Sequence, residues 1–410
     1  MTHGSDAQVE SRYAWLRLFA SLALSSLGGV AMYGVVVALP QVEREFGVAR
    51  ADASLPYAMT MLGFGFGGIL MGRLADRFGV MVPVLIGTLG LGGGLIVAGN
   101  AGSILQFGLA HGLLAGLLGC SATFAPLIAD TSLWFTRRRG MAVAIVSSGN
   151  YLAGAVWPPI LQYFFDHAGW RATYTGVGIF CIAVMLPLAL VLRRRAPALG
   201  PASAAAHAMT KAELPLGLSS NALMALLCIA GVACCVAMSM PQVHIVAYCA
   251  DLGFGAQRGA EMLSVMLAAG IVSRLASGWI CDRIGGLRTL LLGSALQGVA
   301  LFLFLPFDGL VSLYVVSALF GLFQGGIVPA YAIIVREFFP PREAGTRVSI
   351  VIMCTLFGMA LGGWMSGVIF DMTGSYRAAF INGIGWNLLN LVIAFSLLRR
   401  VQPDERIKPA

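Results

Sequence analysis

The sequence predicts an all-α membrane protein with twelve transmembrane helices in two pseudo-symmetric six-helix bundles. Three observations lead to this fold class. Only 11% of the 410 residues are charged, against about 25% in a soluble domain, and the mean hydropathy is +0.85. Charge-free runs long enough to span a bilayer recur along the chain. Motifs of the first half of the chain return in the second half.

The charge-free runs give the order of the spans. In the first half we expect spans within Leu18–Gln41, Ala53–Gly72, Phe78–Ala129, Gly140–Phe165 and Ala172–Leu192. The third of these runs is long enough for two helices, with a break at residues 99–103. In the second half we expect spans within Leu214–Ala250, Met262–Cys281, Thr289–Phe307, Gly309–Val335, Val348–Phe370 and Ala378–Leu398. The runs lack the alternation of barrel strands, so they predict helices.

Positive charge is concentrated in alternate loops. Arginines cluster at Arg137–Arg139, at Arg193–Arg195 and at Arg399–Arg400, all on one predicted side. This bias places both termini in the cytoplasm of a multi-pass protein of the cell (inner) membrane. We therefore assign the net charge of +8 to contacts with the lipid bilayer and its anionic headgroups, and not to nucleic acid.

The two halves repeat one motif and are joined by a linker. Gly72–Gly79 and Gly278–Gly285 both read G-x-x-x-D-R-x-G, each at the predicted inside end of a second span. Residues 196–217 are rich in Ala, Pro, Gly and Ser, which is typical of a flexible linker. We predict a first bundle at 1–195, a cytoplasmic linker at 196–217 and a second bundle at 218–410. Two such halves indicate alternating access around a site at mid-membrane depth.

These motifs resemble the major facilitator superfamily, and the likeness covers roughly Leu16–Leu398. Within it, three stretches are similar to the monocarboxylate porters. They are the run from Pro126 through Trp134–Ala142 to Ser147–Gly149, then Gly169-Trp170-Arg171, and then His244–Gly253 followed by Arg274. The resemblance implies the major facilitator fold and transport of small monocarboxylates of the lactate, pyruvate or 2-hydroxy acid type.

Arg274 is the principal candidate for substrate binding. It lies inside the otherwise uncharged run Met262–Cys281, where a guanidinium costs at least about 2.5–3.5 kcal/mol on insertion scales. Its planar fork of donors matches a carboxylate, and the resemblance implies this same role for the span-8 arginine. On a helix, Gly270, Ser277 and Gly278 share its face, and these small neighbours are expected to leave room for a ligand.

The chain also departs from the pattern of the family. Animal monocarboxylate porters carry an aspartate one turn before the span-8 arginine and a lysine in span 1; here the first position is Gly270, and span 1 has no lysine. Val348–Phe370 has no lysine either, unlike the similar oxalate/formate antiporters. Proton coupling therefore stays open. If transport is coupled to protons, the proton enters with the substrate or uses His244.

Several uncharged polar side chains lie near the middles of spans that line the pathway in this superfamily. Asn150 and Gln324 are the best candidates for hydrogen bonds to the substrate, because an unpaired amide is costly to bury. Tyr33, Tyr151 and Tyr331 are further candidates, and His244 is a candidate ligand of the outer vestibule. For the two amides and the three tyrosines, an interhelical hydrogen bond is the alternative interpretation. For His244 the alternative is a plain interfacial histidine.

Acidic residues at the inside ends of spans are assigned to gating or to ion pairs. The resemblance implies that Asp76 with Arg77, and Asp282 with Arg283, brace the cytoplasmic side of one conformation. Asp130 and Glu337 are expected to form ion pairs, beside Arg137–Arg139 and Arg336 respectively.

The sequence argues against catalysis, metals and cofactors. The eight cysteines lie in or beside apolar spans and form no redox motif, and no cluster of His, Cys, Asp and Glu has the spacing of a metal site. We therefore expect no cofactor, and we expect a monomer whose partners are a small organic anion and, if coupled, protons. Two alternatives stay open: export of a drug or hydrophobic compound, and antiport of the oxalate/formate type. A membrane enzyme or sensor is disfavoured, because the tails are too short for an output domain.

Overall fold

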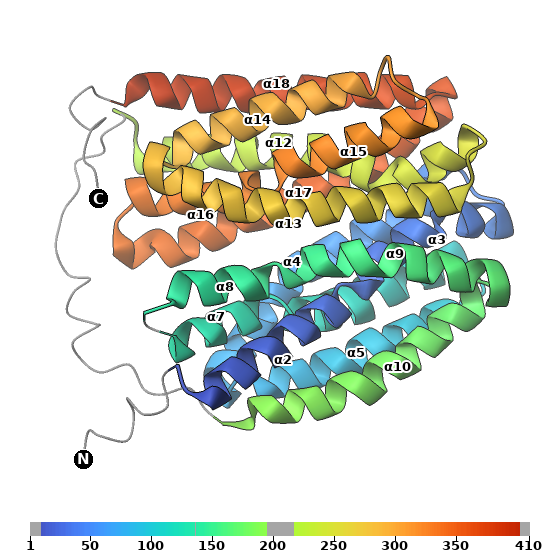
Figure 1. Ribbon diagram of the computed structural model, residues 1–410, viewed down its shortest axis with the longest axis horizontal. Helices are drawn as coiled ribbons and strands as arrows, with labels where there is room; N and C mark the ends of the chain where they lie inside the picture. Colours follow the sequence, from blue (N-terminus) through green and yellow to red (C-terminus); the bar gives the residue numbers. More distant parts are fainter. Residues whose placement is uncertain (1–9, 136, 195–216, 402–410) are drawn as a thin grey trace. The chain divides into compact units, whose positions relative to one another are not determined.

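The computed structural model describes residues 10–135, 137–194 and 217–401 (Figure 1). In this part of the chain every regular element is helical, so the predicted all-α class is confirmed. Contacts divide the chain into two compact units, Met1–Leu199 with Val243–Ser264, and Gly200–Gln242 with Val265–Ala410. Residues 243–264 group with the first unit in this division by contacts, and the bounds of the two bundles along the chain stay a prediction. Apart from Gly217, the predicted linker lies outside the described residues.

The first unit is built from helices of the first half of the chain. In chain order they are α2 (Arg12–Gly28), α3 (Val30–Phe46), α4 (Arg50–Phe78), α5 (Met81–Gly99), α6 (Ile104–Leu109), the π-helix η1 (Ala110–Cys120), α7 (Ala125–Trp134), α8 (Arg139–Ser147), α9 (Gly149–Ala168), α10 (Trp170–Leu190) and the short 3₁₀-helix η2 (Val191–Arg193). Residues 243–251 of α12 and 256–264 of α13 join them.

The second unit takes the rest of the long helices. They are α12 (Ser220–Asp251), α13 (Ala256–Ile284), α14 (Gly286–Leu303), α15 (Leu310–Gln324), α16 (Ile327–Phe338), α17 (Pro341–Thr373) and α18 (Tyr376–Arg400). One core cluster of this unit joins side chains of α12, α14, α16, α17 and α18, with Tyr331 and Ile334 fully buried in it.

Eleven of the described segments are long and apolar enough to cross a membrane. They correspond to predicted spans 1 to 4 and 6 to 12. The predicted fifth span is formed by α8 and α9, and α9 is long enough to cross but is less apolar, because it carries Asn150, two prolines and Gln162. The chain is therefore a multi-pass membrane protein with eleven or twelve apolar helices.

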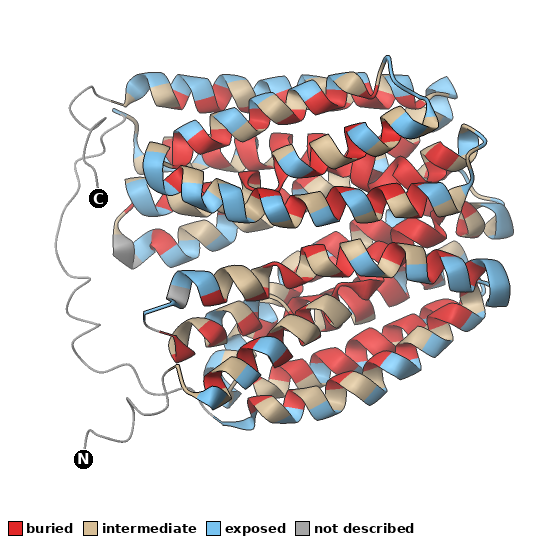
Figure 2. Cartoon of the chain, viewed as in Figure 1, coloured by how far each residue is buried: buried red, intermediate tan, exposed pale blue. Residues whose placement is uncertain are grey.

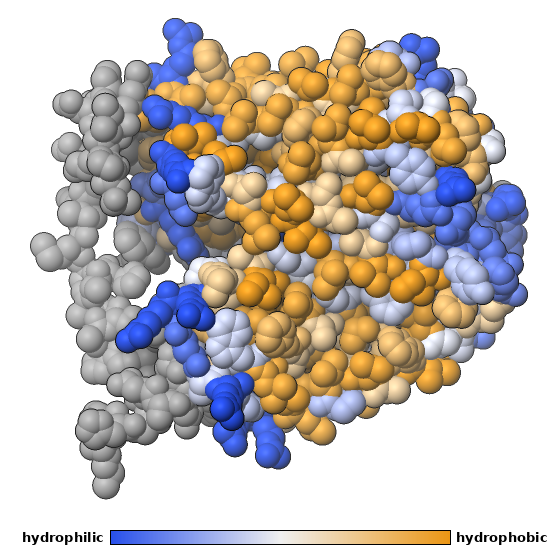
Figure 3. Space-filling model, viewed as in Figure 1, coloured by the Kyte–Doolittle hydropathy of each residue, from blue (hydrophilic) through white to orange (hydrophobic). Residues whose placement is uncertain are grey.

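Large apolar side chains on the outsides of the helices are exposed, as expected when lipid is the solvent. Phe19, Val272, Val311 and Val392 are among them, each more than half exposed. Figure 2 shows that buried and exposed positions alternate around each helix. On the face shown in Figure 3, hydrophobic side chains cover the middles of the helices, and hydrophilic side chains gather near their ends. This arrangement is typical of helices embedded in a bilayer.

The repeated motif ends its helix in the same way in both units. α4 and α13 stop just before Gly79 and Gly285, whose φ angles are +86° and +81°. Each glycine N–H donates to the carbonyl four residues earlier, at 2.8 Å from Ala75 and 2.9 Å from Cys281. A residue with a side chain rarely adopts this φ. The two halves thus share a local backbone geometry as well as a sequence motif.

Two expected ion pairs have different partners in the structure. Asp130 binds Arg17 of α2, with Nε–Oδ2 and Nη2–Oδ1 distances of 2.8 Å, and the Arg17 guanidinium also lies over the Trp134 ring. Glu337 accepts the backbone N–H of Gly286 at 3.0 Å, at the start of α14. A carboxylate is favoured there because the helix N-terminus presents unpaired N–H groups. Arg17 was overlooked because it immediately precedes the first charge-free run.

Candidate functional site

Several spans are interrupted, and each unit has a candidate site at its own interruptions. In the first unit, α2 and α3 meet at Gly29, α8 and α9 meet at Ser148, and η1 is separated from α7 by a turn that ends at Phe124. In the second unit, α15 and α16 are separated by Gly325 and Gly326. Broken helices at membrane depth are tolerated where protein buries them or where they line a cavity, and in transporters they form binding sites.

In the first unit the three interruptions lie against one another. A Cβ atom on Gly28 would lie 1.8 Å from Thr123 Oγ1, and one on Gly149 would lie 2.6 Å from the Ser25 Cβ. Only glycine leaves room for these side chains at such close range. Carbonyl groups released near the α2–α3 break have donors, since Cys120 Sγ donates to Gly28 O at 3.2 Å. The breaks are therefore stable features of the packed unit.

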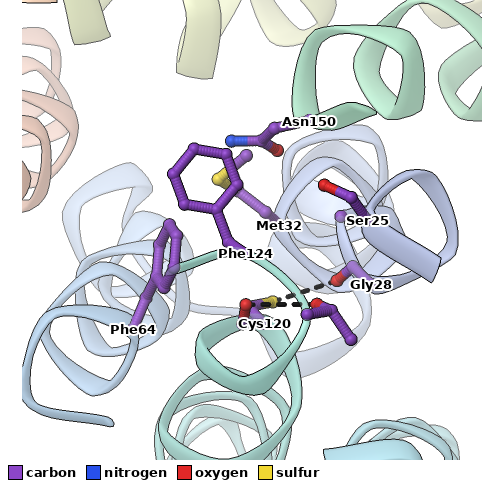
Figure 4. Close-up of a pocket in the computed structure, with 9 residues that line it drawn as sticks. Ser25, Gly28, Met32, Phe64, Cys120, Phe124 and Asn150 are labelled. Carbon is purple, nitrogen blue, oxygen red and sulfur yellow. Dashed lines mark hydrogen bonds between the residues drawn. The ribbon is translucent and has the colours of Figure 1, made fainter. Parts of the chain in front are cut away.

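A small hollow lies where the interruptions meet (Figure 4). It is lined by Ser25, Gly28, Gly29, Met32, Phe64, Cys120, Thr123, Phe124 and Asn150. The rings of Phe64 and Phe124 lie across it from Ser25. It has room for about one water molecule in this structure. Asn150, a predicted binding residue, thus borders a small hollow at a helix break.

Ser25 was not predicted, although it lines the same hollow. Its side chain is 3% exposed, and its Oγ has no hydrogen-bond partner among the described residues. A buried hydroxyl without a partner costs about 1–3 kcal/mol unless water or a ligand satisfies it. The signal in the sequence was its position one helical turn before the pair Gly28-Gly29, in a span that the family resemblance predicts to line the pathway.

In the second unit the helix break packs against the helix that carries Arg274. A Cβ on Gly325 would lie 2.4 Å from Gly270 O, and one on Gly326 would lie 1.9 Å from Ser277 Oγ. The small residues Gly270 and Ser277 therefore let α13 pack against the break. This packing fills the space beside them in which we expected a ligand. Gly278 differs, because a Cβ there would meet nothing within 4 Å.

Arg274 itself is half-buried, ten residues before the end of α13. That is about 15 Å along the helix, so the charge lies deep in the span. Its Nε donates to Gly325 O at the long distance of 3.5 Å, which orients the guanidinium beside the break. The internal repeat places Gly68 of α4 at the equivalent position, and a Cβ on Gly68 would meet nothing within 4 Å. The two units thus differ in charge at matched positions.

Gln324 precedes the same break and is fully buried. Its Oε1 accepts a hydrogen bond from Gln242 Nε2 of α12 at 2.9 Å, while its own Nε2 has no partner among the described residues. An amide donor with no partner beside a helix break suits a carbonyl or carboxylate acceptor. Gln242 was not predicted, because nothing in its charge-free run distinguished it.

The remaining candidates are buried in the helix bundles. The Tyr331 hydroxyl donates to Asn390 Oδ1 at 2.8 Å, inside the core of the second unit. Tyr33 of α3, Tyr151 of α9 and His244 of α12 are all less than a tenth exposed. Their binding roles stay predictions. Among the described residues no group of His, Cys, Asp and Glu is arranged to hold a metal ion.

Comparison with known proteins identifies the family. The sequence profile described as "Major Facilitator Superfamily" matches residues 19–312 and 250–410. The chain belongs to the major facilitator superfamily. Its likeness to the monocarboxylate porters is confirmed by Monocarboxylate transporter 13 of Rattus norvegicus, which is 28% identical over 393 residues, covering 93% of this chain and 88% of the relative. An agnestins efflux protein of Paecilomyces divaricatus is 24% identical over 335 residues, covering 81% and 74%.

Solved structures of this superfamily show the same fold. A bacterial homolog of the human lysosomal transporter Spinster, in an inward-facing and occupied conformation, superposes with a TM-score of 0.72 at 15% identity, covering 98% of this chain and all of that one. The family match and the fold together show that this chain is a transporter of the major facilitator superfamily and not an enzyme.

The superfamily motif residues predicted to act in gating lie at helix ends. Asp76 and Arg77 are exposed in the last turn of α4, and Asp282 and Arg283 are exposed in the last turn of α13. The Arg283 guanidinium lies 3.4 Å from the centroid of the Trp279 ring. Their gating role stays a prediction.

Proposed function

We propose that this chain is a secondary transporter of small monocarboxylates of the lactate, pyruvate or 2-hydroxy acid type, working by alternating access. The observation that carries the proposal is Arg274, a permanently charged, half-buried guanidinium deep in α13 and beside a helix break. A charge at this depth is costly, and in membrane proteins such residues mark substrate or ion pathways. The likeness to Monocarboxylate transporter 13 supports the same class of solute.

The carboxylate would bind the fork of Arg274, because two parallel charge-assisted hydrogen bonds fix both oxygens. Gln324 Nε2 supplies a further amide donor near the same break. Because the Arg274 guanidinium is a single positive charge, it is expected to favour a monocarboxylate over a dicarboxylate such as oxalate.

Purified protein in liposomes tests this function. We expect uptake of radiolabelled lactate above that of empty liposomes, with competition by unlabelled pyruvate and weaker competition by oxalate. The efflux relative supports a second candidate, the export of a hydrophobic compound. Transport of a hydrophobic dye together with no lactate uptake would reject the monocarboxylate function in favour of the second candidate.

A further inference from the structure

An arginine is buried at the start of α4, far from the proposed carboxylate site in the sequence. Arg50 is 6% exposed, and it heads a buried face of the helix that continues through Ala53 and Tyr57, at the spacing of neighbours on one helix face. The loop between α3 and α4 belongs to the side that the charge pattern predicts to be outside. Arginine is almost never fully buried unless it is paired, so its partners show what holds this end of the helix.

The Arg50 guanidinium joins three helices through two carboxylates. Its Nη1 and Nη2 donate to Oδ2 and Oδ1 of Asp251 at 2.9 Å and 3.3 Å, which is the bidentate geometry of strong charge-assisted pairs. Its Nε lies 2.6 Å from Oε2 of Glu43, near the end of α3. Asp251 is the last residue of α12, 201 positions along the chain from Arg50. One buried cation therefore ties the end of α12 to the facing ends of α3 and α4.

This end of α12 belongs to a hairpin that groups with the first half of the chain. We call Val243–Ser264 the outer hairpin; it comprises the end of α12, a short turn and the start of α13. The two helices pack closely in it, since a Cβ on Gly259 would lie 2.5 Å from the Val246 Cα. At the far end of the hairpin, the Ser264 hydroxyl donates to the Ala155 carbonyl of α9. The outer hairpin is thus one compact element, bonded to first-half helices near both of its ends.

α12 has a proline at the root of the outer hairpin. Pro241 lies inside the helix, and the division between the two units falls between Gln242 and Val243. A proline in a helix interior removes one backbone hydrogen bond and clashes with the carbonyl four residues earlier, so helices kink there. α13 continues without a break, and a long helix can follow by gentle curvature. The outer hairpin therefore has a bending point on α12 where it leaves the second unit.

We propose that the Arg50–Asp251 pair is the latch of an outer gate: the outer hairpin closes on the ends of α3 and α4 while the pair is made, and opens when it breaks. Glu43 remains beside the guanidinium when Asp251 leaves, so opening strands no buried charge. The Asp251 side chain is 37% exposed even in the closed form, so water can take over its hydrogen bonds. This division of roles lets the latch break and re-form repeatedly.

The latch is separate from the motif residues predicted to act in gating. Asp76 and Asp282 end α4 and α13 at their other ends, which the charge pattern predicts to lie inside. The inference goes beyond the proposed function, because it does not depend on which solute is carried.

Chemical labelling of a thiol beneath the latch tests the gate. Ala53→Cys places a thiol one turn along the buried face of α4, at a residue that is 1% exposed. A water-soluble maleimide should label it slowly in the purified protein, because this face is buried while the gate is closed. Asp251→Asn should speed labelling at least about tenfold, which corresponds to about 1.4 kcal/mol in the opening equilibrium. Arg50→Asp combined with Asp251→Arg exchanges the two charges and should restore the slow rate of the parent.

The controls separate the latch from general loosening. Protein without Ala53→Cys gives the background from the native cysteines, and the Tm of each variant shows whether it is folded. Arg258→Gln removes an ion pair with Glu261 inside the outer hairpin and should leave the labelling rate unchanged. The latch is overturned if a folded Asp251→Asn protein labels at the parent rate, or if the charge exchange labels as fast as Asp251→Asn alone.

A cross-link gives a second measurement, on transport itself. Arg50→Cys with Asp251→Cys replaces the latch by two thiols, which a bifunctional thiosulfonate can bridge through reducible disulfides. The bridged protein should lose lactate exchange in proteoliposomes and regain it with a thiol reductant, while wild type treated alike should be unaffected. Full exchange with the bridge in place would overturn the gate. If wild type carries no lactate, the proposed function falls, and the labelling rates alone decide on the latch.

Discussion

Replacing Arg274 by alanine should abolish most of the binding of a small carboxylate. The change removes two charge-assisted hydrogen bonds, each worth about 1.5–3 kcal/mol. Because the side chain is half-buried, water replaces part of this energy, and we expect a net loss of about 2–3 kcal/mol. The dissociation constant should therefore rise about 30- to 140-fold.

Ligand-induced stabilisation of the purified protein measures this loss. At a lactate concentration of about 100 times the wild-type Kd, binding stabilises the folded protein by about 2.7 kcal/mol. For Arg274→Ala the same concentration should give only about 0.3–0.9 kcal/mol, so the rise in Tm should shrink to a third or less. Arg274→Lys keeps the charge but loses the planar fork, and its shift should lie between these values.

Arg288 provides the matched control, since it is an exposed arginine near the start of α14. Arg288→Ala should keep the full ligand-induced shift and full uptake. The Tm of each variant without ligand shows whether it is folded. A folded Arg274→Ala protein with an undiminished shift and undiminished uptake would refute the role of this guanidinium.

Three further outcomes follow from the packing. Gly325→Ala places a methyl 2.4 Å from Gly270 O and should cost about 1–3 kcal/mol, seen as a lower Tm, whereas Gly278→Ala enters open space and should change little. Arg17→Ala leaves the buried Asp130 carboxylate without its partner and should lower the free energy of unfolding by up to about 3–5 kcal/mol. Replacing both residues, Arg17→Met together with Asp130→Leu, should recover much of this loss. Tyr331→Phe should lower stability by about 1–2 kcal/mol; unchanged lactate affinity would show that its hydroxyl serves only the bundle.

The sequence was a good guide to the spans, because lipid imposes a simple rule on them. A run without charges must be long enough to cross the bilayer, and the runs predicted here correspond to helices with shifted ends. The interruptions were harder to predict. Gly28-Gly29 and Gly325-Gly326 look like ordinary packing glycines in a chain with 52 glycines, and only the tertiary contacts show which of them break a helix.

The site was predictable where one residue violates the composition of its span. Arg274 stands out for that reason, but its neighbours do not. Helical spacing correctly put Gly270 and Ser277 on its face, yet spacing says nothing about what packs against that face, and here it is another helix. Ser25 was overlooked because an uncharged hydroxyl does not interrupt a hydrophobic run, and its unsatisfied atom is visible only in three dimensions.

The inequality between Arg274 and its counterpart Gly68 has an evolutionary consequence. Duplication left each half with a copy of the same helical position, and only one copy now bears a guanidinium. Because a Cβ on Gly68 would meet nothing within 4 Å, a side chain can begin at this position without a clash, and an arginine there would add one fixed charge to the span of the first unit. Descendants of such a chain can therefore gain or lose a charge at this helical position without any change of architecture.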